Sequence, residues 1–206
     1  MKKIVFCNIM MREDIKPCRY KVNGNSAMEY DGEVIFPVNG VLAGALMNGD
    51  EVRVVLLKKD DIAGNSGRNV GSYIRELDRI NAGIGAKIEY KVLTAPNDEG
   101  RKMQENLLRD IVGELTEGAH IYADITYGMK SLPIIVFSAL SFAEKFFKAE
   151  IKNIVYGKVD FDKDNKPINH ELFDMTALFY LNFIANAMEC KDGEAAKKLL
   201  DTILSE

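Results

Sequence analysis

Short apolar runs alternate with amphipathic segments along most of the chain. Five runs rich in apolar and β-branched residues, each bounded by polar or turn-forming residues, predict strands at 3–7, 51–57, 87–93, 120–123 and 151–156. Intervening segments with apolar positions at helical spacing predict helices from residue 37 to the Asn48-Gly49 pair and over 69–81, 98–115 and 131–148. This alternation predicts a Rossmann-like α/β fold, with a mostly parallel sheet and helices on both faces.

Two regions depart from the alternation. Residues 19–22 and 33–36 flank a segment rich in Asn and Gly, which predicts an N-terminal hairpin insertion or a long excursion. Beyond residue 160, a charged turn at 162–167 precedes two expected helices at 175–188 and 194–204. We therefore expect a Rossmann-like domain over 1–160 and a C-terminal helical extension over 161–206, packed on the domain or at a dimer interface.

Composition excludes several classes of protein. Of 206 residues, 47% are hydrophobic, enough for one well-packed core. The 27 Lys and Arg residues against 31 Asp and Glu residues give a formal charge of −4, so no global basic field favours binding to long DNA or RNA. Any nucleotide site should therefore be small and local.

Cysteine usage and hydropathy suggest a cytoplasmic protein. Cys7, Cys18 and Cys190 form no CxxC pair and no even-numbered disulfide framework, which favours a reducing compartment. The longest apolar stretch, residues 132–143, is interrupted by Ser138 and Ser141 and is shorter than the about 18 residues that span a bilayer. We expect no membrane segment.

The candidate chemistry lies where strands end. In a parallel α/β sheet, ligands bind outside the carboxyl ends of the strands, where loops lead into helix N-termini. Three cations, Arg12, Lys130 and Lys158, follow the first, fourth and fifth expected strands. A local anion site at that edge is therefore compatible with the acidic total.

The loop at 124–131 carries the most information. Gly128 permits a sharp bend, Thr126 and Tyr127 bring hydroxyl groups, and the helix that follows offers free backbone N–H groups beside Lys130. A phosphate would fit there. The plainer alternative is that Asp124 and Thr126 merely cap a buried helix and that Lys130 is a solvated first-turn charge.

A resemblance favours the phosphate site. The segment ADITYGMKSLPIIVFSAL resembles the Asp-x-Thr-His-Gly signature of CRISPR-associated Rossmann-fold (CARF) proteins, with Tyr127 where many members carry His and Lys130 where they carry a basic residue. The tail ELFDMTALFYLNFIANAME is similar to the segment after the last sheet strand in that group. The match covers about 50 C-terminal residues, and the N-terminal half agrees only in its plan of elements.

The resemblance implies a ligand and an assembly. CARF domains pair as homodimers that bind cyclic oligoadenylate across the two-fold axis, and a ring of four or six adenylates can share that axis whereas a ring of three cannot. The resemblance implies two ligand-binding loops, 8–12 and 126–131, which contain Asn8, Ile9, Met10, Met11, Arg12, Gly128, Met129 and Ser131. Asp124 and Lys158 are added as candidate ligand-binding residues by their positions after the fourth and fifth expected strands. The resemblance implies Lys130, Thr126 and Tyr127 as catalytic residues, Lys130 facing the charge that develops on the phosphorus.

No other motif competes well. The histidines His120 and His170 lack the arginine spacing of a HEPN ribonuclease, and Glu89-Tyr90-Lys91 and Glu150-Ile151-Lys152 occur on strands where alternating polar residues are routine. Neither a GxGxxG nor a GxxxxGK[ST] motif follows a strand, and the histidines and cysteines have no zinc spacing. We expect no cofactor and no metal.

Two functions remain open. A ring nuclease would cleave cyclic oligoadenylate without a metal, by attack of a ribose 2′-hydroxyl on the adjacent phosphate to leave a 2′,3′-cyclic phosphate end. A non-catalytic sensor or adaptor would bind the same ring and signal to a partner protein. Both need the same phosphate site, and no residue is an evident general base at neutral pH.

Overall fold

A computed structural model describes residues 1–13, 16–96, 99–163 and 167–205. The chain divides into two compact units, Met1–Met175 and Thr176–Glu206. The first unit is an α/β domain in which the strands β1 (Lys2–Asn8), β2 (Lys21–Asn23), β3 (Glu51–Lys59), β4 (Lys87–Ala95), β5 (His120–Asp124), β6 (Glu150–Phe161) and β7 (Pro167–Asp174) form one sheet. Its order is β2-β7-β6-β5-β1-β3-β4.

The sheet is mostly parallel, as the sequence predicts. Strands β6, β5, β1, β3 and β4 all run in one direction, whereas β7 is antiparallel to β6 and β2 runs parallel to β7. From β1 the chain builds outward through β3 and β4 and then returns to add β5 on the other side of β1. The strand order therefore reverses between β1 and β5, which is the switch point where α/β proteins bind ligands.

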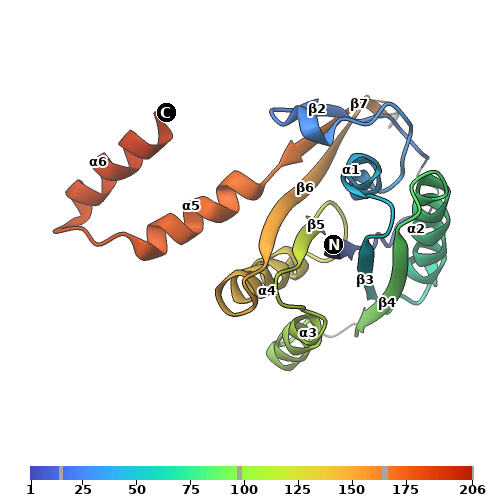
Figure 1. Ribbon diagram of the computed structural model, residues 1–206, viewed down its shortest axis with the longest axis horizontal. Coiled ribbons are helices and arrows are strands. Elements are labelled where there is room, and N and C mark those ends of the chain that lie inside the picture. The colour runs from blue at the N-terminus through green and yellow to red at the C-terminus, as the bar shows by residue number, and fades with distance from the viewer. Residues whose placement is uncertain (14–15, 97–98, 164–166, 206) are drawn as a thin grey trace. The chain divides into compact units, whose positions relative to one another are not determined.

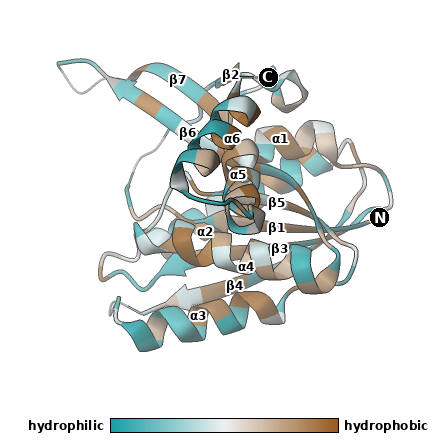
Figure 2. Ribbon diagram, turned by 90° about the vertical axis from the view of Figure 1, so that its left-hand side faces the viewer, coloured by the Kyte–Doolittle hydropathy of each residue, from teal (hydrophilic) through white to brown (hydrophobic). Residues whose placement is uncertain are grey.

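Helices cover both faces of the sheet. The main helices of this unit are α1 (Pro37–Ala45), α2 (Asn65–Asn81), α3 (Arg101–Gly113) and α4 (Ser131–Phe147). Figure 1 shows α1 and α2 against one face and α3 and α4 against the other. In Figure 2, hydrophobic colour follows the strands between these layers, and hydrophobic and hydrophilic segments alternate along α3. The fold is the Rossmann-like arrangement that the alternation of elements predicts.

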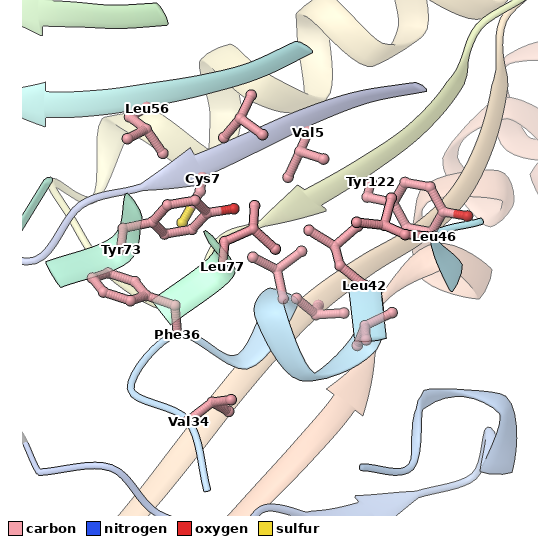
Figure 3. Close-up of a cluster of buried hydrophobic side chains, with 14 of the residues drawn as sticks. Val5, Cys7, Val34, Phe36, Leu42, Leu46, Leu56, Tyr73, Leu77 and Tyr122 are labelled. Atoms are coloured by element: carbon pink, nitrogen blue, oxygen red, sulfur yellow. The ribbon is translucent and has the colours of Figure 1, made fainter. Parts of the chain in front are cut away.

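The core beneath α1 and α2 is closely packed around aromatic residues. Figure 3 shows Cys7 of β1 and Tyr73 of α2 near Phe36, which precedes α1. The Phe36 and Tyr73 rings meet edge to face with centroids 5.0 Å apart, a favourable geometry for buried aromatic pairs. This packing fixes the start of α1 against the sheet.

The expected N-terminal insertion is a long excursion that ends in the far edge of the sheet. Strand β2 pairs with β7, and a short 3₁₀ helix (Ser26–Met28) follows it. Residues 19–22 and 33–36 do not form a regular two-stranded ladder, and an isolated antiparallel bridge joins Cys18 to Val34. The chain then enters α1 through Phe36 and Pro37, with proline in the first turn where it needs no N–H partner.

The expected division at residue 160 is displaced. Strand β6 continues to Phe161 and β7 returns antiparallel to it over Pro167–Asp174, so these residues belong to the sheet rather than to a helical extension. The charged turn expected at 162–167 lies partly outside the described residues. The C-terminal unit contains the two expected helices, α5 (Thr176–Ala187) and α6 (Gly193–Leu204), and the Asp192 side chain caps α6.

Candidate functional site

Two loops leave adjacent strands at the switch point. Residues 8–12 begin with the last residue of β1, and residues 124–131 run from the last residue of β5 to the first residue of α4. The register pairs Cys7 with Asp124. We call these two loops the switch-point site. The structure therefore brings together the two segments that sequence analysis selects, although their side chains serve different purposes.

Asp124 joins two backbone segments beneath the site. Its side chain is buried and accepts hydrogen bonds from the backbone N–H groups of Val38 (3.2 Å) and Thr126 (2.8 Å). Burial raises the pKa of Asp124 to about 6, against the opposing effect of these hydrogen bonds. The carboxyl group thus links the N-terminus of α1 to the loop after β5, and a direct contact between this buried group and a ligand stays a prediction.

Thr126 and Tyr127 hold the loop in place. The Thr126 hydroxyl accepts a hydrogen bond from the N–H of Gly157 (2.8 Å), and its hydrogen bond to Asp124 opposes the rise in that pKa. The Tyr127 hydroxyl donates to the carbonyl of Ile35 (3.0 Å), and burial raises the pKa of Tyr127. Both hydroxyl groups are engaged with the protein in this arrangement, and the catalytic roles expected of them stay predictions.

Asn8 is the unusual side chain of the site. It is fully buried at the end of β1, and neither its amide oxygen nor its amide nitrogen has a hydrogen-bond partner within the described chain. Buried polar groups almost always have partners, and one without them costs about 1–3 kcal/mol. Such an exception points to a group kept for function.

Gly128 lets the loop approach Asn8 closely. Its φ of +95° favours glycine, and a Cβ atom there would lie 3.3 Å from the Asn8 Cβ and 2.8 Å from the Leu132 Cδ1. Asn8 therefore lies directly under the loop that leads into the first turn of α4.

The expected cations differ in their surroundings. Lys130 is exposed at the N-cap position of α4, and no hydrogen bond or ion pair engages its ammonium group within the described residues. Arg12 is exposed, with a guanidinium group that is likewise unengaged in the described part of the chain. Lys158 forms ion pairs with Asp160 (2.9 Å) and Glu171 (3.8 Å). Lys130 and Arg12 remain available to an anion, whereas Lys158 is neutralised and its expected ligand role is not supported.

Several expected ligand residues are core residues instead. Ile9, Met10 and Met129 are buried, so they pack rather than face a ligand, and Met11 is 37% exposed. The Asn69 side chain on α2 donates to the carbonyl oxygens of Met10 and Arg12, both at 2.9 Å. Asn69 thus fixes the first loop, a role that no local sequence signal reveals.

Ser131 and the start of α4 complete the site. The Ser131 hydroxyl donates weakly to Glu99 (3.4 Å). The first backbone N–H groups of α4 carry the positive end of the helix dipole beside Lys130. This arrangement can hold a phosphate, with the Asn8 amide beneath it.

Among the described residues, no group of three His, Cys, Asp or Glu side chains is arranged to bind a metal ion.

A groove lies at the opposite edge of the sheet. This groove of about 450 Å³ is lined by the amino ends of β1, β3 and β4. Its Arg53 side chain pairs with Glu89 (3.2 Å) and Glu114 (3.6 Å), so charges of both signs alternate. It has neither a helix N-terminus with a free cation nor a buried unpartnered amide, and it is the weaker candidate.

None of the helices in the described chain has both the length and the apolar character to cross a membrane.

Part of the chain is similar to CRISPR-associated protein MJ1674 of Methanocaldococcus jannaschii. The two are 25% identical over 149 residues, a match that covers 63% of this chain. The matched part is only 22% of that longer protein. No family model matches the chain.

Proposed function

We propose that this chain is a CARF-type protein of CRISPR antiviral defence that binds cyclic oligoadenylate at the switch-point site. The observation that carries the proposal is the fully buried Asn8 amide without a partner, under a glycine loop that leads into the α4 N-terminus. The unengaged Lys130 and Arg12 supply positive charge at the same loops. The similarity to a CRISPR-associated protein supports the biological setting, and the Asp-Ile-Thr-Tyr-Gly segment supports the ligand.

A phosphate of the ring would lie at the first turn of α4. Its oxygens accept hydrogen bonds from the Ser131 backbone N–H and hydroxyl, and Lys130 balances the charge, whereas Leu132 N–H already donates to Met129 (3.0 Å). Asp124, Thr126 and Tyr127 position this loop through their contacts with Val38, Gly157 and Ile35. They act on the ligand only by holding the backbone that contacts it.

Cleavage of the ring fits this arrangement as a positioning reaction. The 2′-oxygen of one adenylate attacks the adjacent phosphorus, the bond to the 5′-oxygen breaks, and the proton lost from the 2′-hydroxyl is balanced by one gained at the 5′-oxygen. The products are a 2′,3′-cyclic phosphate and a 5′-hydroxyl. The protein contributes a fixed in-line geometry and, through Lys130 and the α4 N-terminus, stabilises the charge on the phosphorane.

A sensor that binds the ring without cleaving it is the second candidate. It is favoured by the absence of an evident proton acceptor among the described loop residues: Asp124 is sealed from solvent, and the Tyr127 hydroxyl is already bonded to Ile35. Such a protein would act through a partner chain.

The test is incubation of the protein with cyclic tri-, tetra- and hexa-adenylate, with and without EDTA, followed by chromatography of the products. Linear products with 2′,3′-cyclic phosphate ends support the nuclease, and tight binding of intact rings supports the sensor. Failure to bind any of the rings contradicts both.

Substitution of one lysine at a time localises the site. We expect Lys130→Ala to weaken ring binding at least about tenfold, because charge-assisted contacts to phosphate contribute about 1.5–3 kcal/mol. Lys148→Ala is the control, since that lysine is exposed at the other end of the same helix, where it pairs with Glu117 (3.3 Å). Equal effects of the two substitutions would argue against a phosphate at the α4 N-terminus.

A further inference from the structure

An aromatic side chain stands beside the switch-point site on the next strand. Asp124 pairs with Cys7 on one side and with Val155 on the other, so Tyr156 of β6 lies level with Asn8 of β1, two strand spacings or about 10 Å away. The residues on either side of Tyr156 bind the loop: the Val155 carbonyl accepts from Ile125 N–H (3.0 Å), and Gly157 N–H donates to Thr126.

Tyr156 faces the same side of the sheet as α4. Val155 belongs to the core beneath α1, and a Cβ atom at Gly157 would meet Pro37 at 2.7 Å, so both neighbours point toward α1. Because side chains alternate along a strand, Tyr156 points to the opposite face. Its side chain is 39% exposed, a large fraction for an aromatic residue.

Tyr156 belongs to a cross-strand aromatic pair. Its ring stacks on Phe173 of β7, the cross-strand partner, with centroids 6.5 Å apart and planes 30° apart. The next pair along this face is Lys158 and Glu171, whose charges offset one another. A neutral, planar group is therefore a better match to this surface than a phosphate.

We propose that the Tyr156–Phe173 pair is a stacking platform for an adenine base of the ligand whose phosphate lies at the α4 N-terminus. This inference rests on the proposed function and adds to it the element that recognises the base. Aromatic side chains bind bases of nucleic acids through their π faces, and each stacked base contributes about 1–3 kcal/mol. The separation of about 10 Å between strands β1 and β6 lets one nucleotide unit contact the Asn8 end of the site and the platform together.

The competing interpretation is that the two rings only stabilise the β6–β7 pair. Cross-strand aromatic pairs contribute to sheet stability without any ligand. That role and the platform make different predictions for a reporter at position 156, because only a platform brings a base into contact with the ring.

The chain has no tryptophan, so a single substitution creates a specific fluorescent reporter. In Tyr156→Trp, we expect cyclic tetra- or hexa-adenylate to quench the tryptophan fluorescence in a saturable manner, since adenine stacks on indole. The matched control is Phe146→Trp, which places an exposed tryptophan near the other end of α4. The control should show no quenching at the same ring concentration. Binding measured by calorimetry without quenching in Tyr156→Trp would overturn the platform.

Affinities of three further variants separate stacking from folding. We expect Tyr156→Ala to weaken ring binding about tenfold and Tyr156→Phe to leave it within about twofold of the unaltered protein. Tyr156→Leu keeps apolar bulk without the π face, so it should bind as weakly as Tyr156→Ala if it folds normally by circular dichroism. If the unaltered protein binds no ring, the proposed function fails. If it binds and Tyr156→Leu binds equally well, the platform alone fails.

Discussion

Asn8 and Asp124 show two opposite uses of a buried polar side chain at neighbouring strand ends. The Asp124 carboxylate accepts hydrogen bonds from the backbone N–H groups of Val38 and Thr126. The Asn8 side chain makes no hydrogen bond within the described chain, although it is equally hidden from water. The Asn8 amide therefore lowers the free energy of unfolding, and a residue that does so is expected where function, rather than stability, selects it.

Asn8→Ala should weaken ring binding about tenfold while leaving the free energy of unfolding unchanged or about 1 kcal/mol higher, because it removes an unpartnered buried amide. Asn39→Ala is the matched control: Asn39 is also fully buried, but its amide donates to Glu76 at 2.9 Å. That variant should lose about 1–3 kcal/mol. Urea unfolding and calorimetric titration measure both effects, and an equal loss of stability in the two variants would contradict the functional role of Asn8.

The pKa of Asp124 predicts a dependence of stability on pH. Because burial raises this pKa from 3.8 to about 6, the folded protein holds the Asp124 proton more tightly than the unfolded chain does. Asp124 therefore contributes most stability below about pH 4, and this contribution is lost as the pH rises to about 6 and above.

We test this with Asp124→Asn, which does not titrate. From pH 4 to pH 7, the free energy of unfolding of the unaltered protein should fall relative to the variant by about 2 kcal/mol, which is most of the energy equivalent of the shift in pKa. Glu76, whose pKa burial also raises, is present in both proteins and largely cancels in the comparison. Urea unfolding at several pH values measures the difference in free energy of unfolding between the two proteins. If that difference does not change with pH, the pKa of Asp124 is not raised in the folded protein.

Helices and strands with a regular spacing of apolar residues were predictable from the sequence. A strand that forms only because it pairs with a neighbouring strand was not. The five parallel strands and α1 to α4 follow directly from sequence patterning, with bounds that shift by a few residues. Strand β7 was missed because its residues do not alternate: three consecutive polar residues, 169–171, separate Ile168 from Leu172. Its strand character comes from pairing with β6. The same holds for side chains: the partner of Tyr127 is Ile35, 92 positions away, and no local pattern encodes it.

The loop between β5 and α4 depends on one glycine. Gly24 and Gly128 have nearly equal φ values, +98° and +95°, but a Cβ atom at Gly24 would meet nothing within 4 Å. Gly24→Ala should therefore cost only the backbone strain, about 1–2 kcal/mol. Gly128→Ala adds contact with buried Leu132 and with Asn8, so we expect about 2–3 kcal/mol more and at least tenfold weaker ring binding.

Thermal and urea unfolding of the two glycine variants measure this difference. Gly24→Ala controls for the cost of the left-handed conformation alone, and its ring binding should equal that of the unaltered protein. Equal losses of stability would show that the loop does not press on Asn8 and Leu132 as the structure indicates.

At the scale of the molecule, strand order and charge concentrate the chemistry at one place. The reversal between β1 and β5 puts two loops side by side at the carboxyl edge. The net charge of −4 leaves few free cations, and Lys158 is paired, so Lys130 and Arg12 stand out at that edge. Two cations per chain suit a ligand with few phosphates rather than a long polyanion, whose binding depends on many such contacts.

A ring with two-fold symmetry should therefore bind two chains together. One phosphate site per chain leaves the opposite side of the ring free, and a second copy related by a two-fold axis presents the same loops to it. We expect calorimetric titration with cyclic tetra-adenylate to give one ring per two chains, and native mass spectrometry to show the liganded dimer. Lys130→Ala is the control for specificity, because it should weaken the binding without changing the ratio. One ring per chain, or a liganded monomer, would contradict the shared site while leaving the site within each chain intact.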